Sequence, residues 1–316
     1  MTFFKKDEQL EQLGLSILQA TWSKFPALNS DQIALTWIVY DPPVLVNTGG
    51  ALSTQEFWHH PVRGFSYRGG ERIYPASVVK LFYLVAVYEW LEKGMIQPSA
   101  ELERAIRDMI VNSSNDATSL VVDVLTGTTS GPELPSGPFE TWKSQRQIVN
   151  RYFQSLGWDE MQAINVCQKT WGDGPYGRER AFVGELMDNR NMLTTNATAQ
   201  LLHSIVGGVA VSSGRSQVMM AVLKSSLQEG LSTEAEENQI TGFLGHSLLP
   251  SAEIWSKAGW TSRVRHDAAY IELPDCYPYL LVVFTEGKEH SQNRAIIPFV
   301  SQLVAEAVTS LGSLPS

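Results

Sequence analysis

The sequence predicts an α/β protein of the α+β type, with an antiparallel sheet of about five strands, flanking helices from both ends of the chain and an inserted all-helical lobe. Strand patterns occur at residues 32–40 and again at 253–287, and long helical patterns lie between them. Strands from the two ends of a chain can pair in one sheet, so the middle is expected as an insertion. We expect residues 1–75 and 206–316 to form the sheet lobe and residues 76–205 the helical lobe.

The first quarter of the chain predicts one helix and two strands. Residues 7–25 carry apolar side chains at helical spacing and stop before Pro26, which indicates an amphipathic helix. Residues 32–40 (QIALTWIVY) read as a strand, residues 41–50 as a turn-rich segment, and a second strand is expected around residues 64–70 (GFSYRGG).

The middle of the chain has the periodicity of helices. Residues 77–94 form a long apolar pattern ended by a glycine, and residues 100–127 predict one or two further helices ended by Gly127. Residues 128–140 are rich in Gly, Pro and Ser and predict a loop, and residues 171–190 predict another irregular, charged stretch.

The last third predicts two helices at 195–205 and 217–227, followed by three strands and a closing helix. The strands are EIWSKAGWT, HDAAYIEL and YLLVVFTEG, joined by short turns, which is typical of an antiparallel meander. The closing helix covers RAIIPFVSQLVAEAVTS and carries one apolar face.

Composition narrows the class of function. The chain has 24 Lys and Arg against 33 Asp and Glu, a net charge of −9, which favours a soluble protein and argues against nucleic acid as partner. No segment has the apolar character of a membrane span, and the first residues lack the apolar region and the cleavage site that predict a signal peptide. We therefore expect a cytoplasmic protein, or a periplasmic one if the start is incomplete. Cys167 and Cys276 are expected as buried, reduced thiols.

Ser77-Val78-Val79-Lys80 is an S-x-x-K motif at the start of the long apolar helix. The spacing puts both side chains on one helix face, and the helix N-terminus favours developing negative charge. A serine hydroxyl needs a base to become a nucleophile, and a partly desolvated lysine can act as that base. The alternative is a helix-capping serine followed by a solvated lysine.

The surrounding sequence resembles the class A β-lactamases. YRGGERIYPASVVKLFYLVAVYEWLEKG is similar to the strand and helix around that family's nucleophile. Ser113-Ser114-Asn115 resembles its S-D-N motif, and Lys257-Ala258-Gly259 resembles its K-T-G strand. The resemblance implies a β-lactamase and transpeptidase-like fold, although capping within the NSSND cluster is the alternative for the second motif.

The resemblance also implies roles for individual residues. Ser77 would be acylated, Lys80 would accept its proton, Ser113 would relay a proton to the leaving group, and Lys257 would supply positive charge near Ser113 and a substrate carboxylate. The backbone N–H groups of Ser77 and Trp260 would form the oxyanion hole. The residues expected to bind substrate are Asn115, Gly259, Trp260, Arg263 and Arg265.

Three departures from the family pattern affect the expected chemistry. Ser113 follows Ser77 by 36 residues, a shorter interval than the family's, which predicts a more open cleft. Ala258 lacks the hydroxyl of K-T-G; Arg263 and Arg265 are possible substitutes or parts of a solvated turn. The E-x-x-L-N motif is absent. Its deacylating role would fall to one of the acidic residues of the irregular stretch, which are Asp173, Glu179 and Glu185.

Other functional classes have weaker support. Residues 172–177 match G-x-G-x-x-G but follow no strand, and no G-x-S-x-G or H-E-x-x-H occurs. The histidines are scattered, with His59 and His60 adjacent, so no metal or cofactor is expected.

Three hypotheses stay open, all with a small-molecule or peptide ligand: a β-lactamase-like serine hydrolase, a penicillin-binding-like protein that acylates without efficient turnover, and a catalytically silent binding module. The sequence leaves the oligomeric state open.

Overall fold

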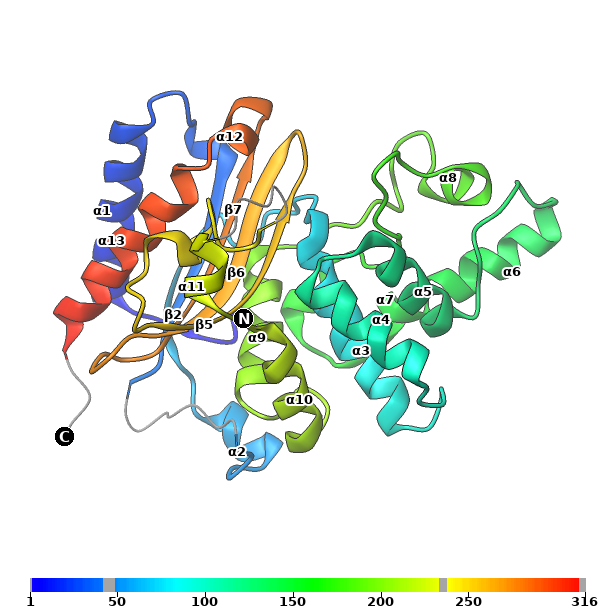
Figure 1. Cartoon of the computed structure of the whole chain (residues 1–316), viewed down its shortest axis with the longest axis horizontal. Helices are drawn as coiled ribbons and strands as arrows, with labels where there is room; N and C mark the ends of the chain where they lie inside the picture. Colours follow the sequence, from blue (N-terminus) through cyan, green and yellow to red (C-terminus); the bar gives the residue numbers. More distant parts are fainter. Residues whose placement is uncertain (1, 42–48, 233–237, 313–316) are drawn as a thin grey trace.

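The computed structural model describes residues 2–41, 49–232 and 238–312. Figure 1 shows a sheet with helices packed along it and a larger group of helices beside it. Most of the turn-rich segment expected at 41–50, namely residues 42–48, lies outside the described residues. Within the described part of the chain, no helix combines the length and the apolar character needed to span a membrane.

The sheet contains the five predicted strands and two more. Its central strands run antiparallel in the order β3, β2, β7, β6, β5. They are β2 (Ile33–Val39), β3 (Arg63–Tyr67), β5 (Glu253–Trp260), β6 (Val264–Glu272) and β7 (Tyr279–Glu286).

The prediction of a five-stranded antiparallel sheet is wrong at both edges. β1 (Lys5–Lys6) pairs in parallel with β3, and β4 (Lys224–Ser225) pairs with β5, so the sheet formed by the described residues has seven strands and is mixed. Each added strand has two residues, too few to carry the two-residue alternation by which a strand is recognised in sequence.

Helices cover both faces of the sheet. α1 (Glu8–Lys24) and α13 (Ile296–Leu311) lie against one face, and α9 (Thr195–Val206) lies against the other (Figure 1). Successive residues of β2 enter different cores: Trp37 packs in the cluster beneath α1 and α13, and Ile38 packs in the cluster shared with the helical group. This two-sided burial explains why β2 is apolar along nearly its whole length.

The helical group is built around α3 (Lys80–Glu92), which follows the 3₁₀ turn η2 (Ala76–Val79). α3 is buried nearly all round, as expected of a helix without a polar face. The predicted ends at Gly94 and Gly127 are confirmed, since both glycines adopt positive φ. The other helices are α2 (Thr54–His59), α4 (Ala100–Val111), α5 (Asn115–Thr126), α6 (Ser136–Arg146), α7 (Ile148–Ser155), α8 (Gly177–Val183), α10 (Ser213–Leu223), α11 (Leu227–Ser232) and α12 (Lys288–Gln292).

Two segments expected to be irregular contain helix. α6 begins inside the predicted loop 128–140, and α8 lies inside the irregular stretch 171–190. α6 starts with Ser, Gly and Pro, which have poor helix propensity, and α8 has only seven residues. Both segments are therefore helical because of their packing against the rest of the protein and not because of their local sequence. The prediction of free, buried thiols is confirmed for Cys167 and Cys276.

Candidate active site

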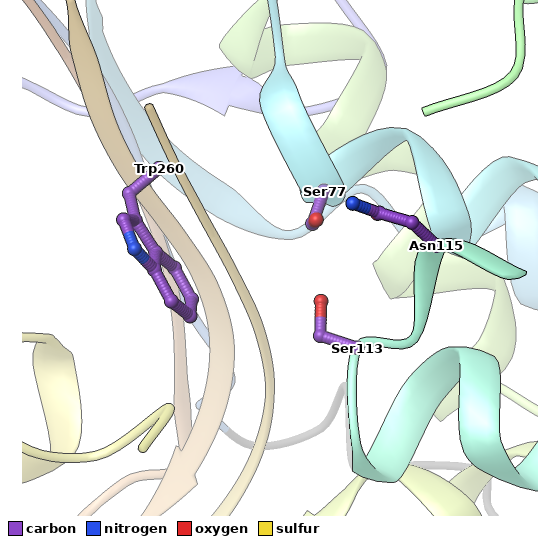
Figure 2. Close-up of a pocket in the computed structure, with 4 residues that line it drawn as sticks. All are labelled: Ser77, Ser113, Asn115 and Trp260. Atoms are coloured by element: carbon purple, nitrogen blue, oxygen red, sulfur yellow. The ribbon is translucent and has the colours of Figure 1, made fainter. Parts of the chain in front are cut away.

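Ser77 lies in η2, immediately before α3, and opens into a cavity of about 170 Å³. The other residues that line this cavity are Ser113, Asn115 and Trp260 (Figure 2). Ala76, the residue before Ser77, has a φ of +47°, a conformation that L-residues with a side chain rarely adopt. The chain therefore bends sharply just before the candidate nucleophile.

Ser113 lies in the turn between α4 and α5 and also has positive φ, at +52°. Such a conformation costs on the order of 1–3 kcal/mol and persists where the surroundings impose it. Here Ser114 begins α5, because its side chain accepts the N–H of Ala117 at 3.2 Å. Its own N–H donates to the carbonyl of Asp108 at the end of α4. The turn directs the Ser113 hydroxyl toward that of Ser77 (Figure 2).

Two fully buried lysines meet at Ser113. Lys80 Nζ lies 3.3 Å from Ser113 Oγ and also donates to the main-chain oxygen of Ser113. Lys257 Nζ lies 3.0 Å from the same Ser113 Oγ. Lys80 comes from the first turn of α3 and Lys257 from the middle of β5. The structure thus joins the three sequence motifs through one hydroxyl group.

This placement changes the ionisation of Lys257. Burial, and after it the charge of Lys80, holds the pKa of Lys257 well below its ordinary value, while Asp267 acts in the opposite direction. A lowered pKa makes it easier for a buried lysine to give up a proton than for a lysine in water. The two amines and the Ser113 hydroxyl therefore form a connected route for a proton.

Asn115 presents its amide N–H₂ to the cavity. Its Oδ1 accepts from Lys80 Nζ at 3.0 Å, which fixes the orientation of the amide. The nitrogen points toward Ser77 (Figure 2). This geometry suits a donor to a ligand carbonyl.

The edge of β5 lies directly against η2 at Gly259. A Cβ added at Gly259 would lie 2.8 Å from the backbone nitrogens of Ser77 and Val78, so only glycine allows this approach. Thr261 N donates to Val264 O at the turn, which makes the next pair, Trp260 with Arg265, a pair without hydrogen bonds. The Trp260 N–H therefore points away from β6 and toward the edge that η2 faces.

The remaining residues of the K-T-G region lie outside the cavity wall. Ala258 is fully buried in the core beneath α1 and α13. Arg265 is also buried, donates to Ser291 O at 2.9 Å and packs over the ring of Phe243. Arg263 is exposed in the turn after β5. The structure does not bring either arginine among the cavity-lining residues.

The three acidic candidates for a deacylating base also lie elsewhere. Asp173 and Glu185 are exposed. Glu179 is completely buried in α8, where it accepts from Arg146, also completely buried, and from Ser130 Oγ at 2.8 Å. Glu179 thus anchors the segment around α8 to α6.

The sequence reasoning missed two residues near the site. Gln239 Oε1 accepts from Lys257, and the buried Asp267 pairs in register with Ala258. Burial raises the pKa of Asp267 to about 7, although two backbone N–H groups oppose this rise. Gln239 lies in a polar stretch that matches no motif; an acidic residue inside the apolar run of β6 was a usable signal for Asp267.

A family model described as the beta-lactamase enzyme family matches residues 98–308, more than half of the chain. The chain belongs to the beta-lactamase enzyme family. A search of curated protein sequences finds no match. As a member of this family the chain is divergent, because the solved structures of similar fold share little sequence with it.

These structures include a beta-lactamase from Sphaerobacter thermophilus, at 18% identity and a TM-score of 0.60, with 95% of this chain and 98% of that chain covered. A point mutant of PBP-A, solved as an acyl-enzyme complex with penicillin G, has 18% identity, a TM-score of 0.64 and coverage of 97% and 98%. The TLA-3 extended-spectrum beta-lactamase has 13% identity, a TM-score of 0.63 and coverage of 92% and 98%. At these identities the likeness is one of fold.

Proposed function

We propose that this member of the family is a serine hydrolase that forms an acyl-enzyme on Ser77 and releases the acyl group slowly. One observation carries the proposal: the hydroxyl of Ser113 lies between two buried lysine amines, beside a cavity into which Ser77 opens. A nucleophile, a proton acceptor and a proton relay are the groups that acyl transfer requires.

The proposed acylation begins with loss of the Ser77 proton to Lys80 as a neutral amine, while the Ser77 oxygen bonds to the acyl carbon. Ser113 then gives its proton to the leaving amine or alkoxide and regains one from Lys80, across the 3.3 Å contact between Nζ and Oγ. Lys257 stabilises negative charge that develops on Ser113 during this transfer.

The oxyanion of the tetrahedral intermediate would bind between the backbone N–H groups of Ser77 and Trp260. The close approach of β5 to η2 at Gly259 and the outward N–H of Trp260 support this assignment. The Asn115 amide would donate to a carbonyl of the acyl group.

Slow release is proposed because deacylation needs a base for water. The residues that line the cavity in the described part of the chain are uncharged, and Glu179 is held in its pair with Arg146. Lys80 and Ser113 would have to serve both half-reactions. A point mutant of PBP-A, which is similar in fold to this chain, has been solved as an acyl-enzyme complex with penicillin G.

The test is intact-protein mass spectrometry during incubation with a fluorescent penicillin or a short-chain nitrophenyl ester. We expect a long-lived mass increment on Ser77, and Ser77→Ala should abolish it. Lys80→Ala should lower the rate at which the mass increment appears by about 10²- to 10⁴-fold. Matched controls are Ser16→Ala, at an exposed position of α1, and Lys93→Ala, at the exposed end of α3. Labelling that persists in Ser77→Ala would refute the proposal, and rapid product release without an adduct would refute the slow step.

A further inference from the structure

In the described part of the chain, the cavity at Ser77 has a polar but uncharged wall. The lining residues Ser77, Ser113, Asn115 and Trp260 carry no charge, and both nearby lysines lie wholly beneath the surface. A positively charged donor to a ligand carboxylate would therefore have to be an N–H of Lys257, of Lys80 or of an arginine that reaches through this wall. The hydrogen bonds of these side chains decide whether such a donor is available.

Lys257 already has as many acceptors as an ammonium group has N–H bonds. Its Nζ contacts Ser113 Oγ at 3.0 Å and Ala258 O at 2.8 Å, and it also donates to Gln239 Oε1. An ammonium group carries three donors and no acceptor, so this set is complete. Lys80 Nζ is also in contact with acceptors inside the site, namely two oxygens of Ser113 and Asn115 Oδ1.

Gln239 is held at both ends of its amide. Its Nε2 donates to the carbonyls of Ile110 at 3.0 Å and Val111 at 2.9 Å, at the end of α4. These two carbonyls accept only, so the Gln239 oxygen must be the atom that faces Lys257. Gln239 thereby links α4 to β5 and keeps one N–H of Lys257 occupied.

The two arginines that follow β5 do not replace the Lys257 N–H that Gln239 occupies. Arg265 is committed to Ser291 O and to the face of Phe243, and Arg263 is exposed in the turn. The aromatic ring of Trp260 stands on the β5 side of the cavity (Figure 2). The side of the cavity formed by Trp260 suits an apolar group of a ligand better than an anionic one.

We infer that Gln239 is a specificity-determining residue, which occupies Lys257 and so selects uncharged esters or amides over acyl donors that carry a carboxylate. The inference rests on the proposed acylation of Ser77. It assigns Gln239 no part in the chemical step, since the amide contacts Lys257 and α4 and is not among the residues that line the cavity.

The test uses penicillin G and its methyl ester, which share one reactive ring and differ in the carboxylate. The measured quantity is the rate of the mass increment on Ser77 with the acid divided by that with the ester. The unmodified protein should acylate the ester at least as fast as the acid. Gln239→Ala, which frees one N–H of Lys257, should raise the ratio on the order of 10-fold. Gln239→Glu, which places an anion on Lys257, should lower it.

Gln12→Ala, at an exposed position of α1, is the matched control and should leave the ratio unchanged. Thermal unfolding of each variant shows whether the fold persists. An unchanged ratio in both Gln239 variants, or a strong preference for the acid in the unmodified protein, would overturn the inference.

Calorimetric binding of the same two compounds to Ser77→Ala, with and without Gln239→Ala, separates the inference from the proposed function. Tighter binding of the acid alone in the double variant supports the inference even if Ser77 is never acylated. Equal effects on acid and ester, or binding of neither, would overturn it even where acylation is observed.

Discussion

Gly259→Ala is expected to slow acylation of Ser77 by displacing β5 from η2. The added Cβ would lie 2.8 Å from the nitrogens of Ser77 and Val78 and 2.9 Å from the oxygen of Pro75. All three are backbone atoms, which cannot turn aside as a flexible side chain can. The strand must move by about 0.6 Å for the shortest separation to reach the 3.4 Å of ordinary contact.

This displacement falls on the proposed oxyanion hole. A misplacement of about 1 Å at a reacting centre costs about 10²-fold in rate, so 0.6 Å predicts a loss of roughly 10- to 100-fold. Overpacking should also lower the free energy of unfolding by roughly 1–3 kcal/mol. The fold should persist, because the strain is confined to one contact between β5 and η2.

The assay is the rate of the mass increment on Ser77 with a nitrophenyl ester, together with thermal unfolding. The matched control is Gly70→Ala, at an exposed glycine with nothing within 4 Å of the added Cβ. Gly259→Ala that acylates as fast as the parent would refute the assignment of the β5 edge to the oxyanion hole. A loss of stability with an unchanged rate would do so too.

Two further predictions concern buried charge. Glu179→Gln should destabilise the fold by about 2–4 kcal/mol in denaturant unfolding, because among the described carboxylates it leaves the buried Arg146 only the more distant Asp123, at 3.7 Å. Asp267→Asn should change how stability depends on pH. Burial raises the pKa of Asp267 from 3.8 to about 7, so its contribution to stability is complete below pH 3.8 and is lost as pH rises through 7. Relative to the parent, the variant should gain up to about 4 kcal/mol between pH 4 and pH 8.

Their controls are simple. Glu185→Gln, at an exposed position of the same region, should change stability by less than about 0.5 kcal/mol, and an equal effect at Glu179 would show that its ion pair contributes nothing. A constant difference in stability between Asp267→Asn and the parent from pH 4 to pH 8 would contradict a buried, titrating carboxyl group.

Local patterns in the sequence determined most of the fold. A short run rich in apolar and β-branched residues identifies β2, and periodicity near 3.6 residues identifies α1 and α13, because each element buries one or both faces in a core. The ends at Gly94 and Gly127 follow from the need for positive φ. The sequence did not predict the edge strands β1 and β4, because a strand of two residues forms only through its pairing with a neighbouring strand.

For the candidate site, the sequence motifs named Ser77, Lys80, Ser113 and Lys257 through their resemblance to the class A β-lactamases, because motif order and spacing are local properties. Only the tertiary structure decided that the two lysines share one hydroxyl and that Gln239 occupies Lys257. Gln239 and Lys257 belong to different elements, and no local pattern encodes a hydrogen bond between them. The same holds for Glu179, since its partner Arg146 is distant in sequence and burial between α6 and α8 makes the pair.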